Sequence, residues 1–312
     1  MIGATQLRIE ETEYSPKQKI QINNKLVWPG EPYKPNLNVI PEFVGRESEM
    51  ELIMAAWISG NHNLPLSPLL VGEPGVGKNR LVYELARLTG RELFLFQGHE
   101  DITAEDLACT IRFSDDEANK MEYVLSPLAC AMINGSIFFL DEIGKIRPRA
   151  LALLVSVLDE RRYLDSSLLG ERIHAHPGFR FVAATNTGEI SLIPEFILSR
   201  IKPVIKVGYP PQEEIEEIIR RQFKNRMQNL TDLLECFWSI WKNNHKNSTP
   251  PTPRDAIAVF GLASSLSDFE KYGGNKKLNL KHWEKPFHLD SGNQDSIVSV
   301  EHLEKSLLKL YS

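Results

Sequence analysis

The stretch VGEPGVGKNR, residues 71–80, places three glycines and a lysine between an apolar segment and a helical one. SPLLV at 67–71 has the composition of a buried strand, and NRLVYELARLTG at 79–90 has helical spacing. Glycines let backbone N–H groups turn inward, and a helix start adds a positive dipole end, so this order predicts a cradle for phosphate groups. We expect Lys78 to reach the outer phosphates, in a cradle formed by Gly72, Glu73, Pro74, Gly75, Val76, Gly77, Lys78, Asn79 and Arg80.

From residue 41 to 209, short apolar segments alternate with helical ones. Strands separated by helices, several of them apolar throughout, predict a parallel sheet covered by helices on both faces. The fold class is therefore α/β, of the kind built around a phosphate-binding loop. The expected strands after 67–71 are ELFLF at 92–96, SIFFLDE at 136–142 and FRFVAATN at 179–186, with a helix RALALLVSVLDE at 149–160.

Polar side chains end two of these strands. Asp141 and Glu142 close a buried strand, where one carboxylate typically holds Mg²⁺ and its neighbour polarises the attacking water. Asn186 closes the next strand and would lie in the same crevice, at the carboxyl ends of the strands, where it could orient the water or contact the third phosphate. Helix or turn capping is the alternative for the carboxylates and for Asn186.

Asn79 departs from the usual loop pattern, in which Ser or Thr supplies a hydroxyl that helps hold Mg²⁺. An asparagine carbonyl oxygen suits this hard cation, but the amide is bulkier and can displace the ion. A slow or partner-stimulated ATPase and a nucleotide-binding protein without turnover therefore both stay open. Glu142 favours hydrolysis, because a chain that only binds nucleotide has little need for that carboxylate.

After residue 209 the apolar spacing is helical only, which predicts a smaller all-helical lid domain. The chain thus divides into a polar extension at 1–40, an α/β nucleotide-binding domain at 41–209 and the lid at 210–312. Arg200 ends a helix before an expected strand, and Arg254 begins a lid helix. Arginine suits the stabilisation of phosphoryl-transfer charge, but it is also a common solvated cap, and spacing does not decide between the two.

Composition excludes several classes of protein. The 312 residues are 42% hydrophobic and 25% charged, as in globular proteins, and the net charge of −5 argues against a general nucleic-acid binder. Three cysteines without C-x-x-C spacing suggest neither a zinc site nor disulfides. With no signal-peptide core and no apolar run of membrane-spanning length, we expect a cytoplasmic protein that does not contact the membrane.

Several segments, taken together, resemble the AAA+ ATPases. Within that class, the segments at 98–107, 158–165 and 170–186 resemble the MoxR branch, and most of all its CbbQ/NorQ-type group, which remodels metalloenzymes. FVGRESEM at 43–50 is similar to the adenine-side segment of these proteins. The segments that resemble Walker A, Walker B, sensor 1, the arginine finger and sensor 2 are, in order, GEPGVGKN, IFFLDE, FVAATN, ILSRI and TPRDA.

The resemblance implies ATP and Mg²⁺ as ligands and a hexameric ring with nucleotide sites between subunits. Arg200 would reach the neighbouring subunit's site, and Arg254 would contact the nucleotide from the lid. Residues 161–177 would form a hairpin facing the pore or a client, so that His174 and His176, like His99 in its loop, are surface residues. The residues implied to serve the nucleotide in their own subunit are Lys78, Asp141, Glu142 and Asn186, with Asn79 and Asp141 next to the metal.

Three functions remain as alternatives. The first is a ring that uses ATP to remodel a protein client, through a partner with a von Willebrand factor A domain. The second is a nucleotide-binding assembly or regulatory module with weak or no hydrolysis. The third is a DNA-associated or phage-defence AAA+ ATPase, which the acidic balance and the lack of a helix-turn-helix pattern disfavour. Specificity would reside in residues 1–40 and in the loop at 272–294, for which the sequence identifies no ligand.

Overall fold

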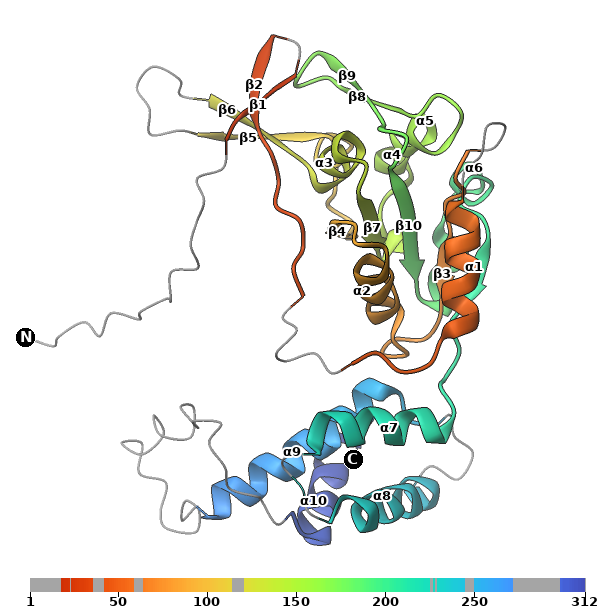
Figure 1. The fold of residues 1–312 in the computed structure, drawn as a ribbon, viewed down its shortest axis with the longest axis vertical. Coiled ribbons are helices and arrows are strands. Elements are labelled where there is room, and N and C mark those ends of the chain that lie inside the picture. Colours follow the sequence, from red (N-terminus) through yellow and green to blue (C-terminus); the bar gives the residue numbers. More distant parts are fainter. Residues whose placement is uncertain are drawn as a thin grey trace, which may run out of the picture. The chain divides into compact units, whose positions relative to one another are not determined.

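The computed structural model (Figure 1) describes residues 18–22, 24–35, 42–58, 64–113, 121–224, 227, 229–244, 250–271 and 298–311. The loop at 272–294 lies outside the described residues, as do most of the first forty. Contacts divide the chain into two compact units. One comprises residues 1–33, 91–182 and 192–201, and the other comprises residues 34–90, 183–191 and 202–312. The division at 40 and 209 predicted above stays a prediction.

A five-stranded sheet in the order β11-β3-β10-β7-β4 confirms the predicted α/β fold. The pairs β10–β3, β11–β3 and β4–β7 are parallel, and every residue of β3, β7 and β10 is buried. Burial on both faces explains why these strands are mostly apolar instead of alternating. The strands are β3 (Leu69–Val71), β4 (Leu93–Gln97), β7 (Ile137–Asp141), β10 (Arg180–Thr185) and β11 (Val204–Lys206).

The described α/β part has α-helices where the sequence predicted them, at 79–90, within 149–160 and before Arg200, and two more that were not predicted. In chain order, the helices are α1 (Glu47–Trp57), α2 (Lys78–Thr89), α3 (Pro127–Asn134), α4 (Pro148–Leu151), α5 (Leu154–Leu158) and α6 (Glu195–Leu198). Helix α3 begins where Ser126 accepts a hydrogen bond from the N–H of Ala129, as an N-cap does. The single helix expected at 149–160 is instead interrupted, because α4 ends at Leu151 and α5 begins at Leu154.

A second, four-stranded sheet was not expected from the sequence. It runs in the order β1-β2-β6-β5, formed by β1 (Ile20–Ile22), β2 (Lys25–Trp28), β5 (Cys109–Phe113) and β6 (Met121–Leu125). Part of the segment interpreted as a polar extension is thus paired in a sheet, with Val27 opposite Tyr123 of β6. A separate hairpin of β8 (Tyr163–Ser166) and β9 (Glu171–His174) confirms the hairpin expected within 161–177.

The last part of the described chain is helical, as predicted. Its helices are α7 (Gln212–Phe223), α8 (Leu230–Asn244), α9 (Pro253–Lys271) and α10 (Val300–Tyr311), and they share one apolar core. The fully buried rings of Phe237 and Phe260 lie 5.5 Å apart in that core. Truncating a buried phenylalanine to alanine typically costs about 3–5 kcal/mol, so each of these rings contributes strongly to the stability of the helical part. No helix among the described residues is long and apolar enough to span a membrane.

Candidate nucleotide site

The phosphate loop has the geometry that its sequence predicts. Helix α2 begins at Lys78, directly after Gly77, whose φ of 106° lies in the left-handed region that only glycine adopts at low cost. No acidic residue occupies the first turn of α2, so its positive end is not neutralised there. The loop between β3 and α2 can therefore receive an anion (Figure 1).

Lys78, the first residue of α2, hydrogen-bonds this loop. Its side chain is 7% exposed, and Nζ donates hydrogen bonds to the carbonyl oxygens of Gly72 at 2.6 Å and Glu73 at 3.1 Å. Nζ also donates to Oδ1 of Asn186 at 3.2 Å. A buried ammonium group held by neutral oxygens is ready to exchange them for phosphate oxygens, which bind it more strongly.

Asn186 lies beside the loop because of strand pairing. Thr185, the last residue of β10, is opposite Val71, the last residue of β3. The residues that follow both strands therefore leave the sheet at the same edge. Asn186 also donates from Nδ2 to Glu189 within the next turn at 3.2 Å, so its side chain serves the turn and the lysine together.

Arg254 is near the loop within the same compact unit. Thr252 caps α9: its backbone N–H donates to Oδ2 of Asp255 at 2.9 Å, and its hydroxyl accepts from the N–H of Asp255 at 3.2 Å. A Cβ placed on Gly75 would lie 2.7 Å from the Thr252 hydroxyl and 3.1 Å from Cβ of Arg254. A glycine at 75 therefore permits the close approach of the helix start that carries Arg254.

Asp141 and Glu142 belong to the other compact unit. Asp141 ends β7, is 7% exposed and accepts the N–H of Glu142 on Oδ1 at 3.0 Å. Glu142 has φ 55°, a left-handed conformation that costs a residue with a Cβ about 1–2 kcal/mol. Its carboxylate accepts from Gln97 at 2.6 Å and pairs with Lys145 at 2.8 Å. Gln97 and Lys145 thus stabilise the negative charge of the Glu142 carboxylate, which is the charge that would polarise an attacking water.

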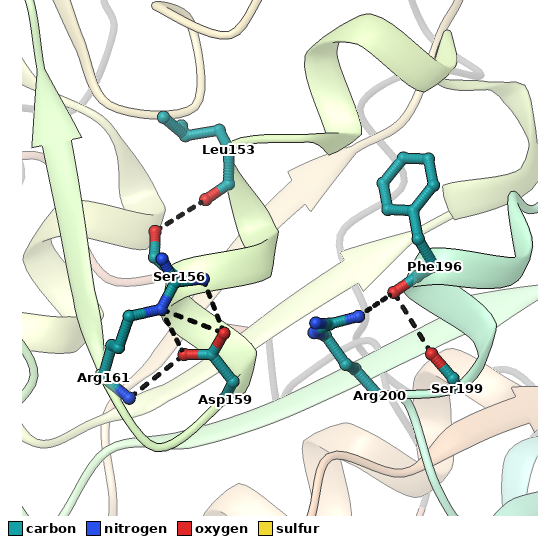
Figure 2. A network of polar contacts seen from close by, with 7 residues as sticks. All are labelled: Leu153, Ser156, Asp159, Arg161, Phe196, Ser199 and Arg200. Atoms are coloured by element: carbon teal, nitrogen blue, oxygen red, sulfur yellow. Dashed lines mark hydrogen bonds and ion pairs between the residues drawn. The ribbon is translucent and has the colours of Figure 1, made fainter.

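Arg200 follows α6 in this same unit (Figure 2). Its Nη1 donates to the carbonyl of Phe196 at 2.6 Å, as a cap does. Its Nε is buried and, among the described residues, has no hydrogen-bond acceptor. Nearby, Arg161 holds Asp159 through Nη2–Oδ2 at 2.7 Å. The pKa of Asp159 lies below its ordinary value because Arg161 hydrogen-bonds the carboxylate and because the charge of Arg200 adds to this effect.

The chemistry of the donors fits Mg²⁺. The described residues contain no group of three or more His, Cys, Asp or Glu side chains that could hold a metal. Mg²⁺ at nucleotide sites needs only one or two protein oxygens beside phosphates and water. Asn79 offers a half-buried amide in one compact unit and Asp141 a buried carboxylate in the other, and oxygens of both kinds suit Mg²⁺. His99, His174 and His176 are exposed, as expected.

Sequence reasoning missed several residues around these groups. Gln97 and Lys145 hold Glu142, Thr252 meets the loop at Gly75, and Arg46 bonds the carbonyls of Val76 and Gly208. Only the Thr252–Asp255 spacing carried a signal, that of a helix cap. The other contacts join residues that are far apart in the sequence or depend on side-chain direction.

Known proteins are similar in sequence to this region. Residues 67–202 match the model of the AAA domain, dynein-related subfamily. An uncharacterized protein of Staphylococcus saprophyticus is 33% identical over 158 residues, which cover 49% of this chain and 60% of that protein. Protein NorQ of Paracoccus denitrificans is 30% identical over 198 residues, which cover 61% of this chain and 68% of NorQ. The chain thus spans about three fifths to two thirds of the length of these two relatives.

Solved structures share the fold. The Holliday junction branch migration motor RuvB of Thermotoga maritima matches with a TM-score of 0.53 and 16% identity, over 86% of this chain and 70% of RuvB. The AAA domain of FIGL-1, solved in complex with ADP, matches with a TM-score of 0.55 and 16% identity, over 85% of this chain and 82% of that domain. At these identities the likeness concerns the fold alone.

Proposed function

This chain belongs to the AAA+ ATPases of the MoxR branch and is of the NorQ type, and from that membership we propose that it hydrolyses ATP slowly to remodel a protein client. The observation that carries the proposal is the buried ammonium of Lys78, held by loop carbonyls and Asn186 beside the positive end of α2. This arrangement provides a cation, backbone turns and a helix dipole where a nucleotide's phosphates would lie.

Each candidate residue has a proposed task. Lys78 binds the outer phosphates, Asn186 orients the attacking water, and Glu142 accepts its proton once Gln97 and Lys145 release the carboxylate. Mg²⁺, when bound, neutralises charge that develops on the phosphates. Asp141 and Asn79 would hold this ion, Arg254 would contact the nucleotide from the helical lid, and Arg200 would act on the site of an adjacent subunit.

We place this activity in a cytoplasmic hexameric ring, with residues 41–209 as its α/β domain and 210–312 as its lid. From the resemblance to the CbbQ/NorQ-type group we infer a protein client, reached through a partner with a von Willebrand factor A domain. Arg200 supports a ring, because its Nε has no acceptor within the described part of its own subunit, as expected if its target is elsewhere.

Phosphate release from Mg-ATP, measured against protein concentration, tests the proposal. We expect the rate per subunit to rise steeply with concentration, because Arg200 completes a site only after assembly. Glu142→Gln should abolish the rate and preserve ATP binding, since the amide cannot accept the proton. A rate that follows concentration only linearly, so that the rate per subunit is constant, would contradict a site shared between subunits.

The second candidate is a nucleotide-binding assembly module with weak or no turnover. Two observations favour it: Asn79 replaces the usual hydroxyl, and Gln97 and Lys145 engage Glu142. If Asn79 limits turnover, Asn79→Ser should raise phosphate release about tenfold or more, since each 1.36 kcal/mol removed from the barrier is tenfold. The same measurement on Asn79→Ala is the control. An unchanged rate of phosphate release in Asn79→Ser would show that Asn79 does not limit turnover.

A further inference from the structure

Arg46 joins two backbone segments that a nucleotide would affect. Its Nη2 donates to the carbonyl of Gly208 at 2.6 Å and to that of Val76 at 3.2 Å. Val76 is in the phosphate loop, and Gly208 lies between β11 and α7. The side chain is only 11% exposed, and its Nη1 is fixed by Glu49 at 3.1 Å. One nitrogen thus contacts both the loop and the segment that leads to the helical region.

The segment that carries Arg46 is also attached to α7. Arg221 of α7 donates from Nη1 to the carboxylate of Glu42 at 3.1 Å and to the carbonyl of Phe43 at 3.3 Å. The carboxyl group of Glu214 fills the space that a side chain on Gly45 would need. Burial raises the pKa of Glu214, and the charge of Arg46 opposes that rise.

The phosphate loop and residues 207–211 between β11 and α7, which we call the linker, also adjoin through the sheet. The N–H of Val207 donates to the carbonyl of Val71 at 2.8 Å, directly before the phosphate loop begins. Val76 itself is 2% exposed, so its backbone cannot move without its packed side chain. A shift of the loop therefore moves the Val76 carbonyl that accepts from Arg46. A tilt of α7 moves the Gly208 carbonyl, which accepts from the same nitrogen.

We propose that Arg46 is a positioning residue that couples nucleotide occupancy of the phosphate loop to the position of the linker and α7. The planar guanidinium can donate to both carbonyls and to Glu49 at once, whereas a lysine ammonium is a compact point charge with a different geometry. The proposal rests on the proposed function only in requiring that the loop bind a nucleotide.

Hydrogen exchange of residues 208–223, with and without saturating ADP, tests this coupling in the full chain. In the wild type we expect ADP to slow exchange there about tenfold, within the usual range of coupling between two sites. Arg46→Gln and Arg46→Lys should bind ADP, measured by calorimetry, and lose most of this slowing. Arg87→Gln is the matched control, because Arg87 is exposed on α2 and its guanidinium hydrogen-bonds Glu84 instead of the loop or the linker.

The outcomes separate this coupling from the proposed function. Full ADP-dependent slowing in Arg46→Gln would overturn it, as would loss of ADP binding in both Arg46 variants, which would make Arg46 a binding residue. If ADP slowed hydrogen exchange in residues 72–78 of the wild type but not in 208–223, the coupling would also be refuted, and the nucleotide site would be supported. If ADP changed hydrogen exchange nowhere in the wild type, the proposed nucleotide site itself would be contradicted.

Discussion

Arg200→Ala should lower phosphate release by about a thousandfold while ATP binding stays within about twofold of the wild type. The first figure is the lower end of the range for arginines that stabilise charge in phosphoryl transfer. Binding should persist because the contacts described for the Arg200 side chain involve neither the loop nor Lys78. Within its unit, the Arg200 side chain donates a hydrogen bond to the carbonyl of Phe196 and interacts by charge with Asp159.

The matched control is Arg172→Ala. Arg172 is another guanidinium of the same compact unit, paired with Asp165 at 2.8 Å on the hairpin of β8 and β9. Its loss removes the same charge and should leave turnover unchanged. Mixing Arg200→Ala with Lys78→Ala subunits should restore part of the activity, because the latter still offer Arg200 to intact loops. Without such recovery, action of Arg200 on a neighbouring subunit would be disproved.

The second large effect is expected from Lys78→Ala, which should weaken ATP binding about a hundredfold or more. Hydrogen bonds to charged groups contribute about 1.5–3 kcal/mol each, and two lost bonds to phosphate give at least about 3 kcal/mol. Each 1.4 kcal/mol is a factor of ten in affinity. Titration with a fluorescent ATP analogue measures this change, and circular dichroism verifies that the variant folds.

Lys206→Ala serves as control for this variant. Lys206 is an exposed lysine at the end of β11, in the same compact unit as the loop. Its removal changes the net charge equally and should alter affinity by less than about twofold, since exposed charges are screened by salt. Equal affinities of Lys78→Ala and wild type would place the nucleotide somewhere other than the loop.

The sequence alone was sufficient for features that depend on local pattern. The glycines and Lys78 predicted a helix start near that lysine, because only a backbone free to adopt positive φ can turn N–H groups inward there. Apolar strands bounded by helices predicted the parallel sheet, since burial on both faces removes alternation. The same pattern predicted strands that close at Asp141–Glu142 and at Asn186, and in the structure they end one residue earlier, at Asp141 and Thr185.

The tertiary structure decided the features that require contacts across the chain. The pairing of β2 with β6 joins residues about a hundred positions apart, and the short strands carry no signal of their partner. Two sets of contacts depend on the direction in which side chains leave strands and helices. One joins Glu142 to Gln97 and Lys145, and the other joins Arg46 to the carbonyls of Val76 and Gly208. Periodicity fixes which face of an element is buried, but it leaves open what that face meets. The sequence therefore determined where a nucleotide's phosphates would bind, and the packing of distant segments determined what surrounds them.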